Sequence, residues 1–131
     1  MIIISRFIHA HKKINKILVI SENQIDNIAV MLAAAKLNKT IIPLNIGLHI
    51  DQIIKIRKII KPDIAILSKN FLHYKKYFFK KVIFFENILN IKEKNLFSPT
   101  VNSSKNKKFI ITFSSGTTSQ PKPIIFSQNT K

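Results

Sequence analysis

The chain has 131 residues, 46% of them hydrophobic and none of them cysteine, which excludes a disordered chain, a disulfide scaffold and thiol chemistry. Its 22 Lys and Arg residues against 6 Asp and Glu residues give a formal net charge of +16. Only Arg6 and Arg57 are arginines and the lysines are scattered, so the charge argues against a nucleic-acid partner, whose readers are usually arginine. No apolar run is long enough for a membrane span, and we expect a soluble, cytoplasmic protein.

The first predicted elements alternate between strand and helix. Residues 16–20 form an apolar run typical of a buried strand. Ser21 and Gln24 have the spacing of a capping box, which predicts a helix with Ser21 as its N-cap that ends near Asn38. A strand follows at residues 40–44. The core-facing stripe expected for the helix consists of Ile25, Ile28, Ala29, Leu32, Ala33 and Leu37.

The same alternation continues through the rest of the chain. Isoleucines between residues 50 and 60 predict a second amphipathic helix, which Pro62 terminates. Further strands are predicted at residues 63–67, 82–85 and 109–113, with a short aromatic, lysine-rich helix at 71–79, a long surface connection at 86–108 and an apolar run at 124–126. The predicted fold class is α/β, a mostly parallel sheet flanked by helices that binds ligands near the carboxyl ends of its strands.

The segment from Ser114 to Lys122 has the composition of a phosphate-binding loop. A site for polyphosphate needs closely spaced backbone N–H groups, hydroxyl side chains and a cation. Gly116 permits close backbone approach, Lys122 supplies the charge, and the hydroxyls come from Ser114, Ser115, Thr117 and Thr118. An ordinary polar turn between two strands is the alternative for the same composition. A Walker A loop is disfavoured, because no glycine stands directly before Lys122 and no Ser or Thr stands directly after it.

The segment also resembles a known signature. Residues 111–122, which read ITFSSGTTSQPK, are similar to the motif of the AMP-forming adenylate-forming enzymes, which include acyl-CoA synthetases, luciferases and peptide-synthetase adenylation domains. That motif commonly reads TSGTTG, any residue, then PKG. Residues 27–37, followed by Ile41-Ile42-Pro43-Leu44-Asn45, resemble the family's helix-then-strand segment. The similarity covers roughly residues 16 to 128.

The resemblance implies an ATP-dependent carboxylate ligase of the acyl-CoA synthetase type. Such an enzyme joins a fatty or other carboxylic acid to AMP with loss of pyrophosphate and passes the acyl group to a thiol such as coenzyme A. Mg²⁺ would accompany ATP to neutralise phosphate charge. The residues implied to contact the phosphates are Ser114, Ser115, Gly116, Thr117, Thr118 and Lys122, within a phosphate-binding loop at residues 111–123. The motif assigns no catalytic residue and no protein metal ligand.

Three positions depart from the family pattern. Ser119 and Pro123 stand where glycine is common, and Gln128 stands where many members have histidine. Proline removes a backbone donor, so either the loop tolerates Pro123 or phosphate binding is weakened. Family members also continue beyond this loop into adenine- and ribose-binding segments and a C-terminal domain. We therefore expect residues 1–131 to be a partial N-terminal domain, either truncated or completed by another chain, and the alternative function is an incompetent remnant or nucleotide-binding module.

Other candidate residues carry weaker signals. The spacing of His9, His11, His49 and His73 does not suggest a metal site. The six carboxylates show no close pair in an apolar setting, and solvated or capping roles are expected for them. The aromatic and lysine residues between 75 and 85 are interpreted as a core strand beside a lysine-rich face rather than as a nucleic-acid strip.

Overall fold

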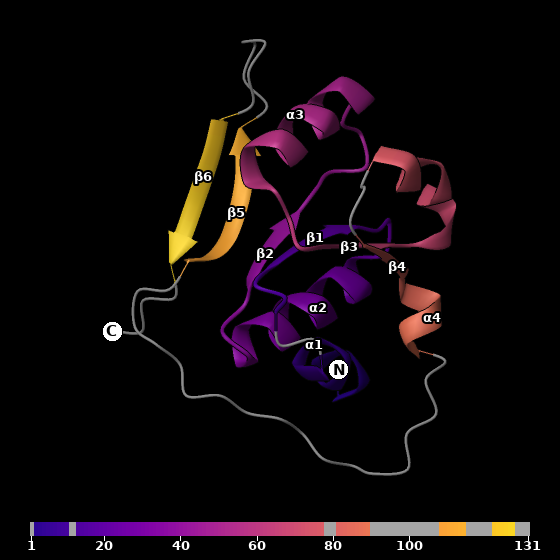
Figure 1. The fold of residues 1–131 in the computed structure, drawn as a ribbon, viewed down its shortest axis with the longest axis vertical. Helices are drawn as coiled ribbons and strands as arrows, with labels where there is room; N and C mark the ends of the chain where they lie inside the picture. Colours follow the sequence, from indigo (N-terminus) through magenta and orange to yellow (C-terminus); the bar gives the residue numbers. More distant parts are fainter. Residues whose placement is uncertain (1, 11–12, 78–80, 90–107, 115–121, 128–131) are drawn as a thin grey trace.

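The computed structural model describes residues 2–10, 13–77, 81–89, 108–114 and 122–127. Helices and strands alternate along the chain (Figure 1). In order they are α1 (Ile2–Ala10), β1 (Lys16–Ile20), α2 (Gln24–Lys36), β2 (Thr40–Pro43), α3 (Ile50–Ile60), β3 (Ile64–Leu67), the 3-10 helix η1 (Lys69–Tyr77), β4 (Val82–Phe84), α4 (Phe85–Leu89), β5 (Lys108–Ser114) and β6 (Lys122–Ser127).

The strands form one six-stranded sheet in the order β4-β3-β1-β2-β5-β6. All neighbouring pairs are parallel except β5 and β6, which pair antiparallel as an edge hairpin. In the register, Ile20 of β1 lies opposite Leu67 of β3, and Ile41 of β2 lies opposite Ile110 of β5. The parallel strands therefore end together at one edge of the sheet, and this confirms the predicted fold class.

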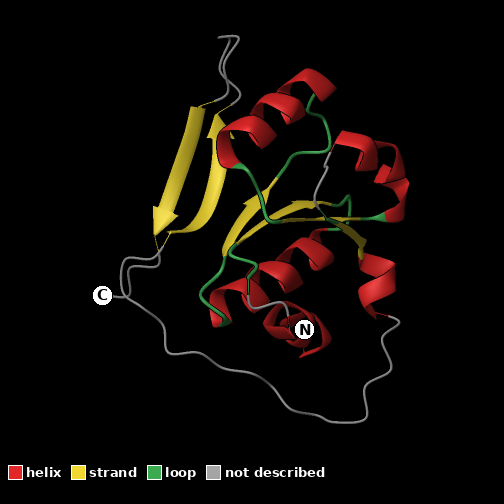
Figure 2. Ribbon diagram, viewed as in Figure 1, coloured by secondary structure: helices red, strands yellow, loops and turns green. Residues whose placement is uncertain are grey.

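Helices cover both faces of the sheet (Figure 2). Alternating strand residues divide the core in two, because successive side chains of a strand point to opposite faces. Ile17 and Val19 of β1 pack on the side of α1, α2 and α4. Leu18 and Ile20 pack on the side of α3, Phe71 and Tyr74. The four β1 residues from Ile17 to Ile20 are fully buried, as expected for a central parallel strand.

Side chains also fix the amino ends of two strands. One Asp63 carboxylate oxygen, at the start of β3, accepts from the backbone N–H groups of Asn15 and Lys16, both at 2.9 Å. The Lys16 ammonium donates to the carbonyl of Ile60 at the end of α3, at 3.1 Å. These bonds tie β1 and β3 together at the edge opposite their carboxyl ends.

Two predictions for α2 are wrong, the second only in part. Its N-cap is Asn23, whose side chain accepts from the N–H of Ile25, and not Ser21, whose hydroxyl accepts from the N–H of Asn23 two residues earlier in the turn. The predicted core stripe is wrong in part: its members Ala33 and Leu37 are buried, but Ile25, Ile28 and Leu32 are exposed. The buried residues are Val30, Ala33, Ala34 and Leu37. α2 is apolar on most sides, so its pattern alone does not fix the buried face.

The surface connection predicted from residue 86 is partly wrong. Residues 85–89 form α4, and its Phe85 and Ile88 are buried in the core beside α1. A helix of five residues is too short to show a period in the sequence. The rest of the predicted connection, residues 90–107, lies outside the described residues. Within the described part of the chain, no helix is long and apolar enough to cross a membrane.

Candidate functional site

The β5–β6 hairpin fixes both ends of the predicted phosphate loop. β5 and β6 pair from Lys108 opposite Ser127 to Ser114 opposite Lys122. The antiparallel pairing therefore brings the two ends of the predicted loop together. Four predicted phosphate contacts, Ser115, Gly116, Thr117 and Thr118, lie in residues 115–121, outside the described residues. Ser114 and Lys122 are brought side by side.

The loop leaves the sheet at its carboxyl edge. β5 runs parallel to β2, so Ser114 ends its strand on the same side as the turn that follows Pro43 (Figure 1). Open α/β sheets bind ligands outside the carboxyl ends of their strands. The position of the segment is therefore the one expected for a ligand-binding loop.

Lys122 and Pro123 belong to the edge strand. β6 pairs with β5 alone among the described strands, and all six of its residues are exposed. An edge strand tolerates proline, since a strand at the edge of a sheet leaves backbone N–H groups outside the ladder. Pro123 lies opposite Phe113 without breaking the pairing that continues to Lys122. Lys122 is exposed and lies opposite Ser114, the last residue of β5.

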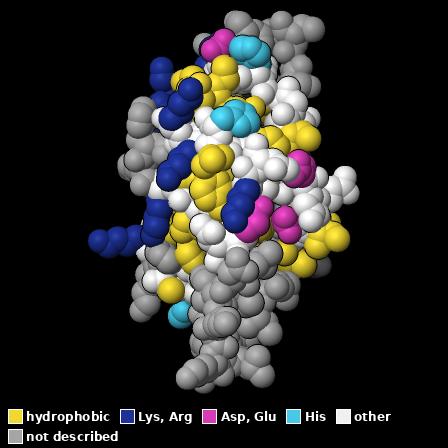
Figure 3. Space-filling view, turned by 90° about the vertical axis from the view of Figure 1, so that its right-hand side faces the viewer, with side chains coloured by type: hydrophobic (Ala, Val, Ile, Leu, Met, Phe, Trp, Pro, Cys, Tyr) yellow, Lys and Arg dark blue, Asp and Glu magenta, His cyan; other side chains and the backbone are white. Residues whose placement is uncertain are grey.

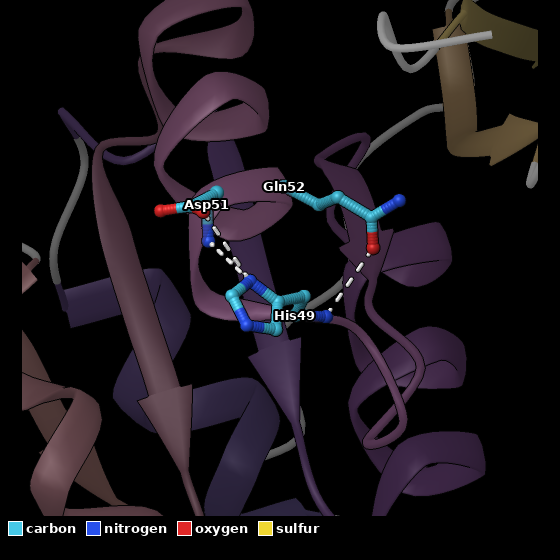
Figure 4. Close-up of polar contacts among 3 residues, drawn as sticks. All are labelled: His49, Asp51 and Gln52. Atoms are coloured by element: carbon cyan, nitrogen blue, oxygen red, sulfur yellow. Dashed lines mark hydrogen bonds and ion pairs between the residues drawn. The ribbon is translucent and has the colours of Figure 1, made fainter.

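The neighbouring turn after β2 is ordered by local hydrogen bonds. The Asn45 side-chain oxygen accepts from the N–H of Gly47 at 2.9 Å. His49 then caps α3: its Nδ1 accepts from the N–H of Asp51 at 3.4 Å, and its own N–H donates to Gln52 Oε1 at 3.2 Å (Figure 4). His49 Nδ1 also lies 3.5 Å from the Asp51 carboxylate. His49 is thus a capping residue.

Metal-ligand clusters are absent from the described residues, where no group of three or more His, Cys, Asp and Glu side chains could hold an ion. His73 instead packs against Tyr74, with ring centroids 4.2 Å apart, and Tyr74 stacks on Phe71 at 5.8 Å. His11 lies outside the described part of the chain. Histidine chemistry therefore has no support in the described structure.

A second polar group lies at the carboxyl ends of β1, β3 and β4, and the sequence did not predict it. Burial and the nearby charge of Glu86 raise the pKa of Asp26, whereas a hydrogen bond with the Ser21 side chain lowers it. Sequence spacing did not indicate that the charges of Asp26 and Glu86 influence each other. The two residues are 60 positions apart in the sequence. Only the order of the strands, which brings α2 and α4 to the same face of the sheet, could have suggested that they interact.

Comparison with known proteins identifies the fold. No protein-family model and no curated sequence matches the chain. The solved structure of VinN covers 97% of it with a TM-score of 0.85 at 17% identity. The o-succinylbenzoate CoA synthetase MenE from Bacillus subtilis, in complex with the acyl-adenylate OSB-AMP, covers 97% with a TM-score of 0.82 at 14% identity. A fatty acyl-adenylate ligase from L. pneumophila, in complex with acyl adenylate and pyrophosphate, covers 95% with a TM-score of 0.77 at 16% identity.

The chain spans only part of each neighbour, namely 36% of VinN, 34% of MenE and 23% of the L. pneumophila ligase. At these sequence identities the likeness is one of fold. The chain has the α/β fold found in the N-terminal domain of adenylate-forming enzymes.

Proposed function

We propose that the chain is the N-terminal portion of an ATP-dependent, AMP-forming carboxylate ligase of the acyl-CoA synthetase type. The observation that carries this proposal is the position of the β5–β6 hairpin. It holds the ends of a hydroxyl-rich segment that contains Gly116 at the carboxyl edge of the sheet, in a fold shared with enzymes solved in complex with acyl adenylates. Because the proposed reaction consumes ATP, we place it in the cytoplasm as part of the same proposal.

The residues proposed to hold the ATP phosphates are Ser114, Ser115, Gly116, Thr117, Thr118 and Lys122. Their donor set suits the ligand, because hydroxyls, backbone N–H groups and one ammonium all donate to phosphate oxygens. The exposed position of Lys122 supports its role as a mobile charge that follows the phosphates. These residues bind and orient the nucleotide, and the proposal assigns no proton transfer to them.

Two further components follow from the proposed reaction. Mg²⁺, bound to the phosphates, would supply charge neutralisation as an anionic carboxylate attacks, and coenzyme A would accept the acyl group. Because the chain spans less than two-fifths of the neighbours named above, the remaining substrate contacts are proposed to come from further polypeptide. The carboxylic acid, fatty or otherwise, would be selected there.

The phosphate contact of Lys122 is tested by calorimetric titration of the chain with ATP and Mg²⁺. A chain of net charge +16 attracts any polyanion, so the control must remove one equal charge elsewhere. Lys75 on η1 is an exposed lysine far from the hairpin in the fold. We expect Lys122→Ala to weaken ATP binding about tenfold, the loss typical of one charged hydrogen bond, and Lys75→Ala to change it less than twofold. Equal losses in the two variants would contradict the assignment.

A second function is a nucleotide-binding module without turnover, favoured by the small share of the neighbouring enzymes that the chain spans. The two functions differ in one measurable reaction, the carboxylate-dependent exchange of labelled pyrophosphate into ATP. Binding of ATP without exchange, over a panel of carboxylic acids, would support the module. Exchange that depends on one class of acid would support the ligase and identify that class.

A further inference from the structure

The sheet has a topological switch point between β1 and β3, here called the crevice, away from the β5–β6 hairpin. The chain leaves β1 toward α2 on one face of the sheet and leaves β3 toward η1 on the other (Figure 1). Such a reversal of the connections opens a space outside the carboxyl ends of the two strands, and α/β folds commonly bind ligands there. The residues at this point are Ser21 after β1 and Ser68 after β3.

Ser68 is a buried hydroxyl without a partner. The residue is 5% exposed, and no group of the protein forms a hydrogen bond with its Oγ. Leu67 faces the α3 side of the sheet, so strand alternation directs Ser68 to the opposite side, toward α2 and α4. Ser21 extends β1 next to it on the same side, because Ile20 and Leu67 are paired and the Ser68 N–H donates to the Ile20 carbonyl at 3.0 Å.

A carboxylate is held on each side of Ser68. Glu86, in the first turn of α4, accepts with Oε1 from the N–H of Lys69, the residue after Ser68, at 3.1 Å. Its other oxygen, Oε2, is buried without a partner. Asp26, in the first turn of α2, bonds with the Ser21 side chain and feels the charge of Glu86. Glu86 is therefore placed next to Ser68 by its bond to Lys69, and its charge effect on Asp26 supports a position of Asp26 nearby.

Asn27 completes the group. Its side-chain N–H donates to the Ser21 carbonyl at 3.2 Å, which leaves its oxygen Oδ1 buried without a hydrogen bond. The unpaired atoms of this group, Asn27 Oδ1, Ser68 Oγ and Glu86 Oε2, are thus all oxygens that can accept or coordinate. Asn27 Oδ1 and Glu86 Oε2 can only accept, and Ser68 Oγ can accept as well as donate, so a positively charged ligand would satisfy all three atoms at once.

The charge distribution supports a cation at this edge. Only six of the 131 residues are acidic, yet Glu22 joins Asp26 and Glu86 here and accepts from the Asn70 side chain across the two loops. Figure 3, which views the molecule from the side of η1 and α4, shows acidic side chains gathered near the middle of a face that is otherwise rich in lysine. Neighbouring carboxylates repel one another, and a cation bound between them would remove that repulsion.

We propose that this crevice binds one monovalent metal cation, sodium or potassium, through Asp26, Asn27, Ser68 and Glu86. Carboxylate, amide and hydroxyl oxygens are hard ligands, which suit such ions. The unpaired oxygens are fully enclosed, so the ion enters without its water shell, and magnesium gives up its water reluctantly. The described residues also hold no group of three acidic or histidine ligands, and two carboxylates match a singly charged ion better than a divalent one.

The test is the thermal unfolding midpoint of the chain in three chloride salts at equal ionic strength. Sodium and potassium can enter the site, and tetramethylammonium is too large. The shared chloride gives the same screening of the basic surface in all three. We expect sodium or potassium to raise the midpoint by roughly 5 °C at ten times its Kd, with saturation as the concentration rises. Equal midpoints in the three salts would overturn the proposal, as would a larger, saturable rise with calcium or magnesium.

Variants locate the effect. Glu86→Gln keeps the shape but removes a charge, and we expect it to abolish the ion-specific rise. Asp51→Asn, an exposed carboxylate on α3, is the matched control and keeps the rise. Ser68→Ala keeps the test decisive if Glu86→Gln fails to fold. If the Ser68 hydroxyl is a ligand, Ser68→Ala reduces only the rise of the unfolding midpoint that sodium or potassium produces. If the hydroxyl is merely unpaired, Ser68→Ala raises the midpoint equally in all three salts, and that result would contradict the site.

Discussion

Lys61 ends α3 in the left-handed conformation, with φ 52° and ψ 64°. A residue with a side chain is strained there, and glycine is the usual occupant of such a position. We expect Lys61→Gly to stabilise the fold by about 0.5–1 kcal/mol, after allowance for the greater freedom of glycine in the unfolded chain. Urea unfolding measures the change. Lys58→Gly, in the exposed interior of the same helix, should instead destabilise by about 1 kcal/mol, and stabilisation by both variants would contradict the explanation.

Asp26 gives a pH-dependent prediction. Its pKa in the folded chain is raised above 3.8, by burial first and by Glu86 second. A raised carboxyl pKa means that the charged form is disfavoured in the fold, so the group lowers stability above its folded pKa and has no effect below 3.8. In a buffer free of sodium and potassium, Asp26→Asn should therefore unfold at higher urea than the parent chain at pH 7, with a difference that vanishes as the pH falls below 3.8. A difference that is independent of pH would contradict this account.

At the residue scale the sequence predicted the phosphate-loop residues from their chemistry, but it did not reveal the polar group around Ser68. Ser114 and Lys122 are close in sequence, so a local pattern could identify them. Asp26, Ser68 and Glu86 come from three separate elements, and their proximity depends on the order of the strands. A contact of this kind leaves no local pattern in the sequence.

Among the helices and strands, the start of α2 allows a direct test, because a single side chain caps it. The Asn23 side chain accepts from the Ile25 N–H at 2.9 Å, and Asn23→Ala should destabilise the chain by about 1 kcal/mol, the usual contribution of an N-cap. Gln24, the partner expected for a capping box with Ser21, is an exposed first residue of the helix. Gln24→Ala should therefore be nearly neutral in the same urea experiment. The reverse order of effects would restore Ser21 and Gln24 as the cap.

Strands were easier to predict than helix faces. The apolar runs of β1, β3 and β5 are flanked by polar residues, so their boundaries were predicted to within one residue. β1 and β3 are buried on both faces, and β5 is buried at Ile111. The buried face of α2 was predicted only in part, because alanines on one side pack against the sheet while Ile25, Ile28 and Leu32, also assigned to the core, are exposed. Hydrophobicity favours the larger side chains as core residues, but close approach of helix and sheet favours the small ones.

At the scale of the whole molecule, alternation of strand and helix was sufficient to predict the parallel sheet. Right-handed crossovers limit the arrangements that such a chain can adopt. The antiparallel β6 was predicted only as an apolar run, because nothing local to Ile124, Ile125 and Phe126 distinguishes an edge strand from a central one. All three side chains are exposed in the structure, although central strands such as β1 have the same composition.

The segment from Ser114 to Lys122 is proposed to bind the phosphates of ATP at the carboxyl edge of the sheet. This binding is tested most directly by nuclear magnetic resonance of the ¹⁵N-labelled chain during titration with ATP and Mg²⁺. We predict that the largest amide shifts fall between residues 114 and 122, with smaller ones in the neighbouring turn at residues 45–49. Shifts spread evenly over lysine-rich surfaces such as η1, with none between residues 114 and 122, would contradict the claim.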